Sequence, residues 1–149
     1  MDNLDPEKNA SCLSKQENIK NLFTDCATSQ AKYQKLIDLG RTCLPLAPEF
    51  KTSDNVVNGC QSTMYLRAFL DDNGNAVFEA ESEALISSGL AALLISVYSN
   101  EPPEVVLTCP PHFIEEIGIR ASLTPGRSNG LSSMYLRMKQ EALKLLVNR

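Results

Sequence analysis

The chain has 149 residues, of which 43% are hydrophobic and 21% are charged, values typical of one globular domain. The net charge of −4 argues against nucleic acid binding, because proteins that bind phosphate backbones carry a basic surface. Apolar segments are too short to span a membrane, and the acidic N-terminus lacks the features of a secretion signal, so we expect a cytoplasmic protein that binds no membrane.

The first predicted element is a helix that begins at Glu17, after a polar segment over residues 1–16 that we expect to be flexible. Its apolar face is predicted to contain Ile19, Leu22, Phe23 and Cys26. Thr28 and Ser29 are candidate caps for a second helix, and Gly40 lies where a helix C-terminal glycine is expected. The periodicity does not decide between two helices and one bent helix.

A β-hairpin is predicted in the middle of the chain. Prolines at 45 and 48 indicate a loop over residues 41–55, and the alternating pattern of residues 63–70 then predicts a strand. The turn residues Asp71–Asn75, with Asn73 and Gly74 able to take positive φ, lead into a returning strand over residues 76–80.

Helices are predicted to follow the hairpin. Ser82 is a candidate N-cap for a helix whose buried face consists of Ile86, Leu90, Leu93, Leu94 and Val97. A brief helix over residues 111–118, a loop over 123–129 and a final helix from about Gly130 complete the chain. We therefore expect one α+β domain over residues 17–149, in which helices pack on the face and ends of a small antiparallel sheet with a central hairpin.

The five cysteines are the candidate chemical groups. Their odd number and the absence of a CxxC pair indicate free thiols, and a single histidine, His112, does not favour a Cys/His zinc site. Cys60 follows Gly59 at a bend just before the hairpin, where a thiol projects and can meet a partner. The alternative for Cys60 is a small buried apolar residue. Cys26 fits a buried position and Cys12 an exposed one, while the sequence does not decide between the two readings for Cys43 and Cys109.

Four segments of the chain together resemble one known family. Val57–Ser62 (VNGCQS) is similar to the V-x-G-C-Q-S motif of SufE-type sulfur acceptors, a family with a SufE/IscU-like fold. Lys32–Gly40, Ser82–Leu90 and Leu123–Leu131 resemble three further motifs of that family in the same order and spacing. One departure is Tyr65, where the family often has tryptophan.

The resemblance implies that Cys60 accepts persulfide sulfur from a SufS-like cysteine desulfurase, stimulates that enzyme, and passes the sulfur to a SufB-containing scaffold complex for iron–sulfur cluster assembly. Pyridoxal phosphate would belong to the desulfurase, and this chain would hold neither cofactor nor metal. Gly59 is the expected hinge of the loop. Gln61 and Ser62 either donate hydrogen bonds to sulfur or begin the strand, and Arg127 either favours the thiolate or pairs with a surface carboxylate.

Three other functions stay open at this point. A U-type iron–sulfur scaffold would need about three converging thiolates and usually a carboxylate, and Cys60, Cys109 and Cys43 do not match the motifs of that family. A cysteine hydrolase would pair Cys60 with His112. A docking module would use no covalent chemistry.

Overall fold

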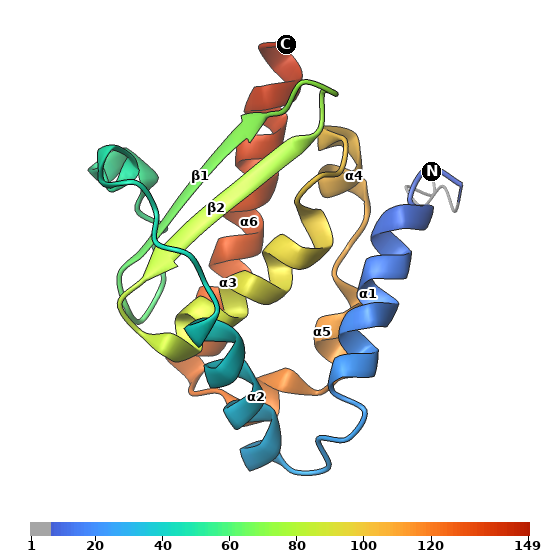
Figure 1. The fold of residues 1–149 in the computed structure, drawn as a ribbon, viewed down its shortest axis with the longest axis vertical. Coiled ribbons are helices and arrows are strands. Elements are labelled where there is room, and N and C mark those ends of the chain that lie inside the picture. The colour runs from blue at the N-terminus through green and yellow to red at the C-terminus, as the bar shows by residue number, and fades with distance from the viewer. Residues whose placement is uncertain (1–6) are drawn as a thin grey trace.

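A computed structural model of the chain describes residues 7–149. These residues form six α-helices, three short 3₁₀ helices and one two-stranded antiparallel sheet. The predicted α+β class is therefore confirmed. Figure 1 shows the hairpin lying across two helices, with the N-terminal helix at the opposite side of the molecule.

The hairpin consists of β1 (Met64–Leu70) and β2 (Ala76–Ser82), with Met64 opposite Ser82 and Leu70 opposite Ala76. The Asp71 carboxylate accepts hydrogen bonds from the backbone N–H groups of Asn73 and Asn75, both at 2.9 Å, and Gly74 has a φ of +79°. The predicted hairpin is confirmed, but only Gly74 of the two expected turn residues takes a positive φ.

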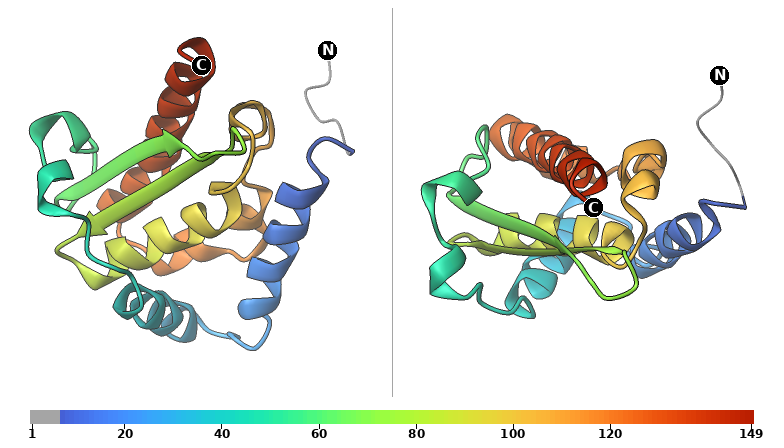
Figure 2. Two further views of the ribbon diagram at one scale, coloured as in Figure 1. Left: turned by 45° about the horizontal axis from the view of Figure 1, so that its top comes forward. Right: turned by 90° about the horizontal axis from the view of Figure 1, so that it is seen from above.

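One face of the hairpin packs on two helices, α3 (Leu85–Tyr98) and α6 (Pro125–Val147). In the left view of Figure 2, α6 passes behind the hairpin, and the right view shows α6 along one side of it. The two helices meet buried residues of the strands, namely Met64, Leu66, Ala76 and Phe78. The whole predicted apolar face of α3 is buried, as expected for the helix at the centre of the core.

The helix α2 (Ser29–Arg41) crosses α3 at very close range. Thr28 caps α2 as predicted, its hydroxyl oxygen accepting the Ala31 N–H at 3.0 Å. Gly40 is not the C-terminal glycine we expected, because the helix continues to Arg41. A β-carbon at Gly40 would lie 2.1 Å from the Leu85 carbonyl oxygen, so this glycine permits the close helix contact.

The helix α1 (Ala10–Leu22) begins seven residues before the predicted start at Glu17, and Leu22 is exposed. Residues 10–16 of the segment expected to be flexible are helical, and residues 1–6 lie outside the described part of the chain. The buried face of α1 includes the polar Gln16, whose amide is satisfied by hydrogen bonds to distant residues. A pattern of apolar residues therefore could not reveal this part of the helix.

The helix α6 also begins earlier than predicted, at Pro125 and not at Gly130. Thr124 is its N-cap and accepts the Arg127 N–H at 3.2 Å, while Pro125 occupies the first turn. Pro125 and Gly126 suggested a loop over 123–129, yet a proline is equally suited to the first position of a helix. The loop motif of the sequence is thus the first turn of the longest helix.

Ser82 was expected to cap the next helix, but it is the last residue of β2. Its pairing with Met64 and the hydrogen bond from its hydroxyl to the Thr63 carbonyl at 2.8 Å keep it in the sheet, and α3 begins at Leu85.

The remaining α-helices are α4 (Pro103–Thr108), which packs on α6, and α5 (His112–Glu116), which packs on α1. The 3₁₀ helices are Pro48–Phe50, Ser53–Asn55 and Ile119–Ser122.

Candidate functional site

Cys60 lies at the tip of a short loop whose two ends are held together. The Val57 N–H donates to the Met64 carbonyl at 2.8 Å, and Val56 pairs with Tyr65 in an isolated antiparallel bridge. Residues 58–63 therefore form a closed loop that extends beyond the start of β1. Its base is fixed by the sheet, while its tip depends on other contacts.

The tip of the loop rests on one side of α6. Three consecutive loop residues face helix positions three and four residues apart, which lie on one helix face: Gly59 faces Ser133, Cys60 faces Gly130 and Gln61 faces Gly126. Gly59 has a φ of +91°, and a β-carbon there would lie 2.5 Å from the Ser133 hydroxyl. A glycine at position 59 thus permits both the positive φ of the backbone and the close approach of the loop to Ser133.

The thiol of Cys60 is half-buried between the loop and α6. Its Sγ faces the Gly130 carbonyl oxygen at 3.9 Å, a long contact that holds the sulfur weakly. Burial raises the pKa of the Cys60 thiol above its ordinary value. In this position the sulfur is protonated at neutral pH and is a weak nucleophile.

Gln61 and Ser62 do not bind the sulfur in this arrangement. The Gln61 side-chain oxygen accepts a hydrogen bond from the Thr124 hydroxyl at 2.7 Å, so Gln61 attaches the loop to the N-cap of α6. Ser62 is half-buried and precedes β1, which begins at Met64. Neither residue donates to Cys60 among the described contacts.

Arg127 lies in the first turn of α6, one turn before the glycine that faces Cys60. Its guanidinium forms no ion pair with any residue from 7 to 149, and its Nε is buried without a hydrogen-bond partner. The expected alternative, pairing with a surface carboxylate, is therefore not observed in the described part of the chain. Arg127 carries an uncommitted positive charge on the helix that supports the loop.

Arg137 is a further residue of this site that the sequence did not reveal. Its Nη1 donates to the Val56 carbonyl at 2.9 Å, its Nη2 donates to the Asp54 carbonyl, and its Nε pairs with Glu141 at 3.1 Å. The side chain thus joins the segment that leads into the loop to α6. The contact spans 81 residues of sequence, and only a basic residue in a helix was visible in the pattern.

The other cysteines lie away from Cys60. The Cys43 thiol donates to the Ser88 carbonyl at 3.4 Å, and Cys26 is half-buried beyond the end of α1. Cys12 was expected to be exposed but is completely buried, together with Cys109. Within residues 7–149, no group of three or more His, Cys, Asp or Glu side chains is arranged to bind a metal ion. The three thiols considered for an iron–sulfur scaffold are held at separate places.

His112 does not meet Cys60 either. It is exposed on α5 and lines a pocket with Gln16 and Glu17 of α1, whereas Cys60 lies against α6. The pairing that a cysteine hydrolase requires is therefore not formed by these two residues.

Among residues 7–149, none of the helices combines the length and the apolar character of a membrane-spanning segment.

Comparisons with known proteins agree with one another. A family model described as "SufE: Fe-S metabolism associated domain" matches residues 17–142. SufE-like protein 1, chloroplastic/mitochondrial, of Arabidopsis thaliana is 40% identical over 133 residues, which cover 89% of this chain but 36% of that protein. An uncharacterized SufE-like protein of Synechocystis is 35% identical over 112 residues, 75% of this chain and 70% of that protein.

The fold is also similar to a solved structure. The solution structure of a hypothetical protein from Thermus thermophilus superimposes with a TM-score of 0.73 at 25% sequence identity. The match covers 89% of this chain and 96% of the other. The similarity therefore includes nearly all of both domains.

Proposed function

The chain belongs to the SufE family, whose domain is associated with iron–sulfur metabolism, and from this premise we propose that it is a sulfur acceptor that carries persulfide sulfur on Cys60. The observation that carries the proposal is the position of Cys60 at the tip of a loop closed at its base and weakly held at its sulfur. A loop of this kind presents one thiol to a partner without unfolding the domain.

The proposed reaction is a thiol exchange. The Cys60 thiolate attacks the terminal sulfur of a persulfide on the partner's cysteine, forming a new sulfur–sulfur bond. The bond between the partner's two sulfurs breaks, and the electron pair leaves with the partner's cysteine thiolate. Cys60 then carries the persulfide, with no net oxidation or reduction in the step.

The raised pKa of Cys60 means that the thiol requires activation when it meets the partner. Lifting the loop from α6 would remove the burial that raises this pKa, and Gly59 is the residue about which the loop would turn. Arg127 has a guanidinium that pairs with no carboxylate of residues 7–149 and is available to stabilise the thiolate during the exchange. Gln61 acts by attaching the loop to the N-cap of α6 and not by binding sulfur.

The partner in this proposal is a SufS-like cysteine desulfurase, which holds the pyridoxal phosphate and is stimulated when its persulfide is removed. The recipient is a SufB-containing scaffold complex. A cytoplasmic location stays a prediction, and the Arabidopsis relative is named as chloroplastic/mitochondrial.

Mass spectrometry tests the proposal. The protein is incubated with a desulfurase, pyridoxal phosphate and cysteine, and the peptide that contains Cys60 is expected to gain the mass of one sulfur atom. The Cys60→Ser variant should gain none and should not stimulate the desulfurase. Full stimulation by that variant would instead identify the protein as a docking module without covalent chemistry.

A further inference from the structure

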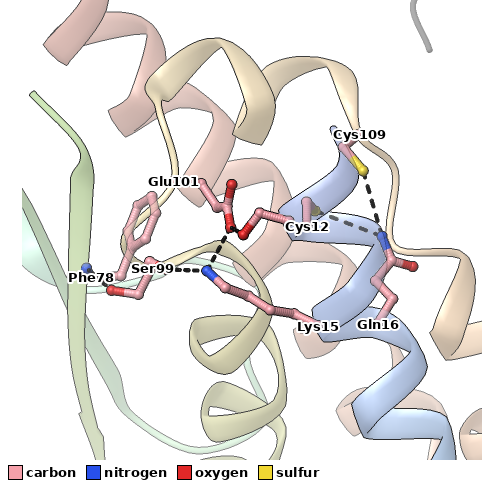
Figure 3. A network of polar contacts seen from close by, with 8 residues as sticks. Cys12, Lys15, Gln16, Phe78, Ser99, Glu101 and Cys109 are labelled. Carbon is pink, nitrogen blue, oxygen red and sulfur yellow. Dashed lines mark hydrogen bonds and ion pairs between the residues drawn. The ribbon is translucent and has the colours of Figure 1, made fainter. Parts of the chain in front are cut away.

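Two further thiols, remote from Cys60, lie close to one amide group inside the domain. Cys12 lies in the first turn of α1, and Cys109 directly follows α4; both side chains are fully buried. Figure 3 shows the two side chains converging on the amide of Gln16. The Gln16 Nε2 is 3.8 Å from the Cys12 sulfur and 3.6 Å from the Cys109 sulfur.

The Gln16 side chain is itself fixed by the segment that contains Cys109. Its Nε2 also donates to the Pro110 carbonyl at 2.9 Å, and its Oε1 accepts the Phe113 N–H at 3.1 Å. One amide group, fixed by these two bonds, thus lies within 3.8 Å of two sulfurs whose residues are 97 positions apart in the chain.

We propose that Cys12 and Cys109 form a disulfide when the protein meets a small-molecule disulfide oxidant. One thiolate attacks the oxidant, forming a mixed disulfide and releasing one thiolate of the oxidant. The second cysteine attacks the protein sulfur of the mixed disulfide and displaces the other half of the oxidant. The two cysteines lose two electrons, the oxidant gains them, and the two protons go to the released thiols.

The start of α1 offers a route by which the oxidant reaches the buried pair. The N-cap residue Asn9 makes no side-chain capping hydrogen bond, and the first turn has no acidic residue. Ser11 in this turn donates a hydrogen bond to Glu101 at 2.8 Å, and Lys15 in the next turn forms an ion pair with Glu101 at 2.6 Å. Opening of this one turn uncovers Cys12 while the rest of the core stays folded.

The disulfide would join α1 to the connection between α4 and α5. Because α4 packs on α6, the bond would stabilise the framework that supports the Cys60 loop without involving Cys60 itself. The disulfide would close the chain between Cys12 and Cys109 into a ring that includes most of the domain, so it would restrict the unfolded chain strongly. This site is independent of sulfur transfer and would persist in a protein that lacks Cys60.

The test uses the folded full-length chain, treated with oxidised glutathione, then alkylated and digested without reduction. We expect one linked peptide pair joining Cys12 to Cys109, lighter by two hydrogen atoms than the separate peptides and separated by dithiothreitol. The Cys43→Ser variant is the matched control and should form the same link, whereas Cys12→Ser should not. Glutathione adducts alone, or a link that involves Cys60 instead, would overturn the proposal.

A thermal melt supplies a second measurement. Oxidation of the wild-type protein is expected to raise Tm by about 10 °C, given the number of residues between Cys12 and Cys109 and the size of the domain. The rise should reverse on reduction and should be absent in Cys12→Ser. An unchanged or lower Tm in an oxidised wild-type sample would contradict a disulfide that fits the folded geometry.

Discussion

Two helix contacts in this protein depend on glycines, and they leave different amounts of room. Between α2 and α3, a β-carbon on Gly89 would lie 2.0 Å from the Leu36 carbonyl oxygen, and both sides of the contact are backbone. Between α6 and the Cys60 loop, a β-carbon on Gly130 would lie 3.5 Å from the Cys60 Cα and 3.6 Å from its sulfur. The first contact is backbone against backbone and cannot yield. The second leaves ordinary van der Waals distances at Gly130, and its closer approaches, at Gly59 and Gly126, are to the ends of the Ser133 and Gln61 side chains.

This difference separates the part of the molecule that sets the fold from the part that we propose to move. The α2–α3 contact fixes two helices in the core. The loop is bound to α6 by side-chain ends, such as those of Ser133 and Gln61, and by one long sulfur contact. A loop held in this way can leave the helix at small energetic cost, while the core beneath it stays in place.

The largest effect is expected from Gly89→Ala. The added methyl group clashes with backbone that cannot shift, so the free energy of unfolding should fall by about 3 kcal/mol. Urea denaturation measures this change. The Ser96→Ala variant, at an exposed site on the same helix, should change it by less than about 1 kcal/mol. A Gly89→Ala protein as stable as wild type would show that the two contacts do not differ.

Gly59→Ala is expected to affect the loop more than the fold. The positive φ and the clash with Ser133 should lower the free energy of unfolding by about 2 kcal/mol, and the lifted loop should make iodoacetamide alkylation of Cys60 several-fold faster. Gly74→Ala is the matched control, because Gly74 also has a positive φ but would meet no atom within 4 Å. That variant should lose stability without faster alkylation; equal alkylation rates in both would contradict the contact with α6.

Arg137→Met removes the two hydrogen bonds that join the segment before the loop to α6. Both carbonyl acceptors lie near the surface and can bind water, so the free energy of unfolding should fall by only about 1 kcal/mol, with a modest rise in Cys60 alkylation. Lys144→Met is the control, since Lys144 also pairs with Glu141 but does not touch the loop. If both variants alkylate alike, Arg137 has no role in holding the loop.

The smallest effect concerns the pH dependence of Cys60 in the wild-type protein. Only the thiolate is alkylated, and burial raises the pKa of this thiol, so the thiolate fraction at a given pH is lower than in a free cysteine. The alkylation rate should therefore still be rising well above pH ~8.5, the pH at which half of a free cysteine is thiolate. A plateau below that pH would mean that a cation, for which Arg127 on α6 is the candidate, already stabilises the thiolate at rest.

Sequence patterns predicted the elements whose signals are local. The hairpin turn, the Thr28 cap and the buried face of α3 each depend on residues a few positions apart, and each was predicted correctly. The start of α1 was missed because Gln16 is buried through hydrogen bonds to residues 94 and 97 positions away. Burial of a polar side chain depends on its distant partners, which periodicity does not contain.

In the candidate site, too, the sequence predicted the local features and missed the contacts between distant residues. The position of Cys60 in a loop before a hairpin followed from Gly59 and the turn residues nearby. The packing of the loop on α6 could not be predicted, because Cys60 and Gly130 are 70 residues apart in the sequence and Arg137 and Val56 are 81 residues apart. The Pro125–Arg127 segment also suits both a loop and a first helical turn, so the sequence alone did not place Arg127 on a helix.

The central claim is that Cys60 alone receives the sulfur. The most direct measurement is a single-turnover transfer of labelled sulfur from a persulfidated desulfurase to the wild-type, Cys60→Ser and Cys43→Ser proteins. Cys43 is the matched control, since it is also half-buried and burial raises its pKa too. We expect label on the wild type and on Cys43→Ser at equal rates and none on Cys60→Ser. Label that reaches Cys60→Ser at the wild-type rate would contradict the account.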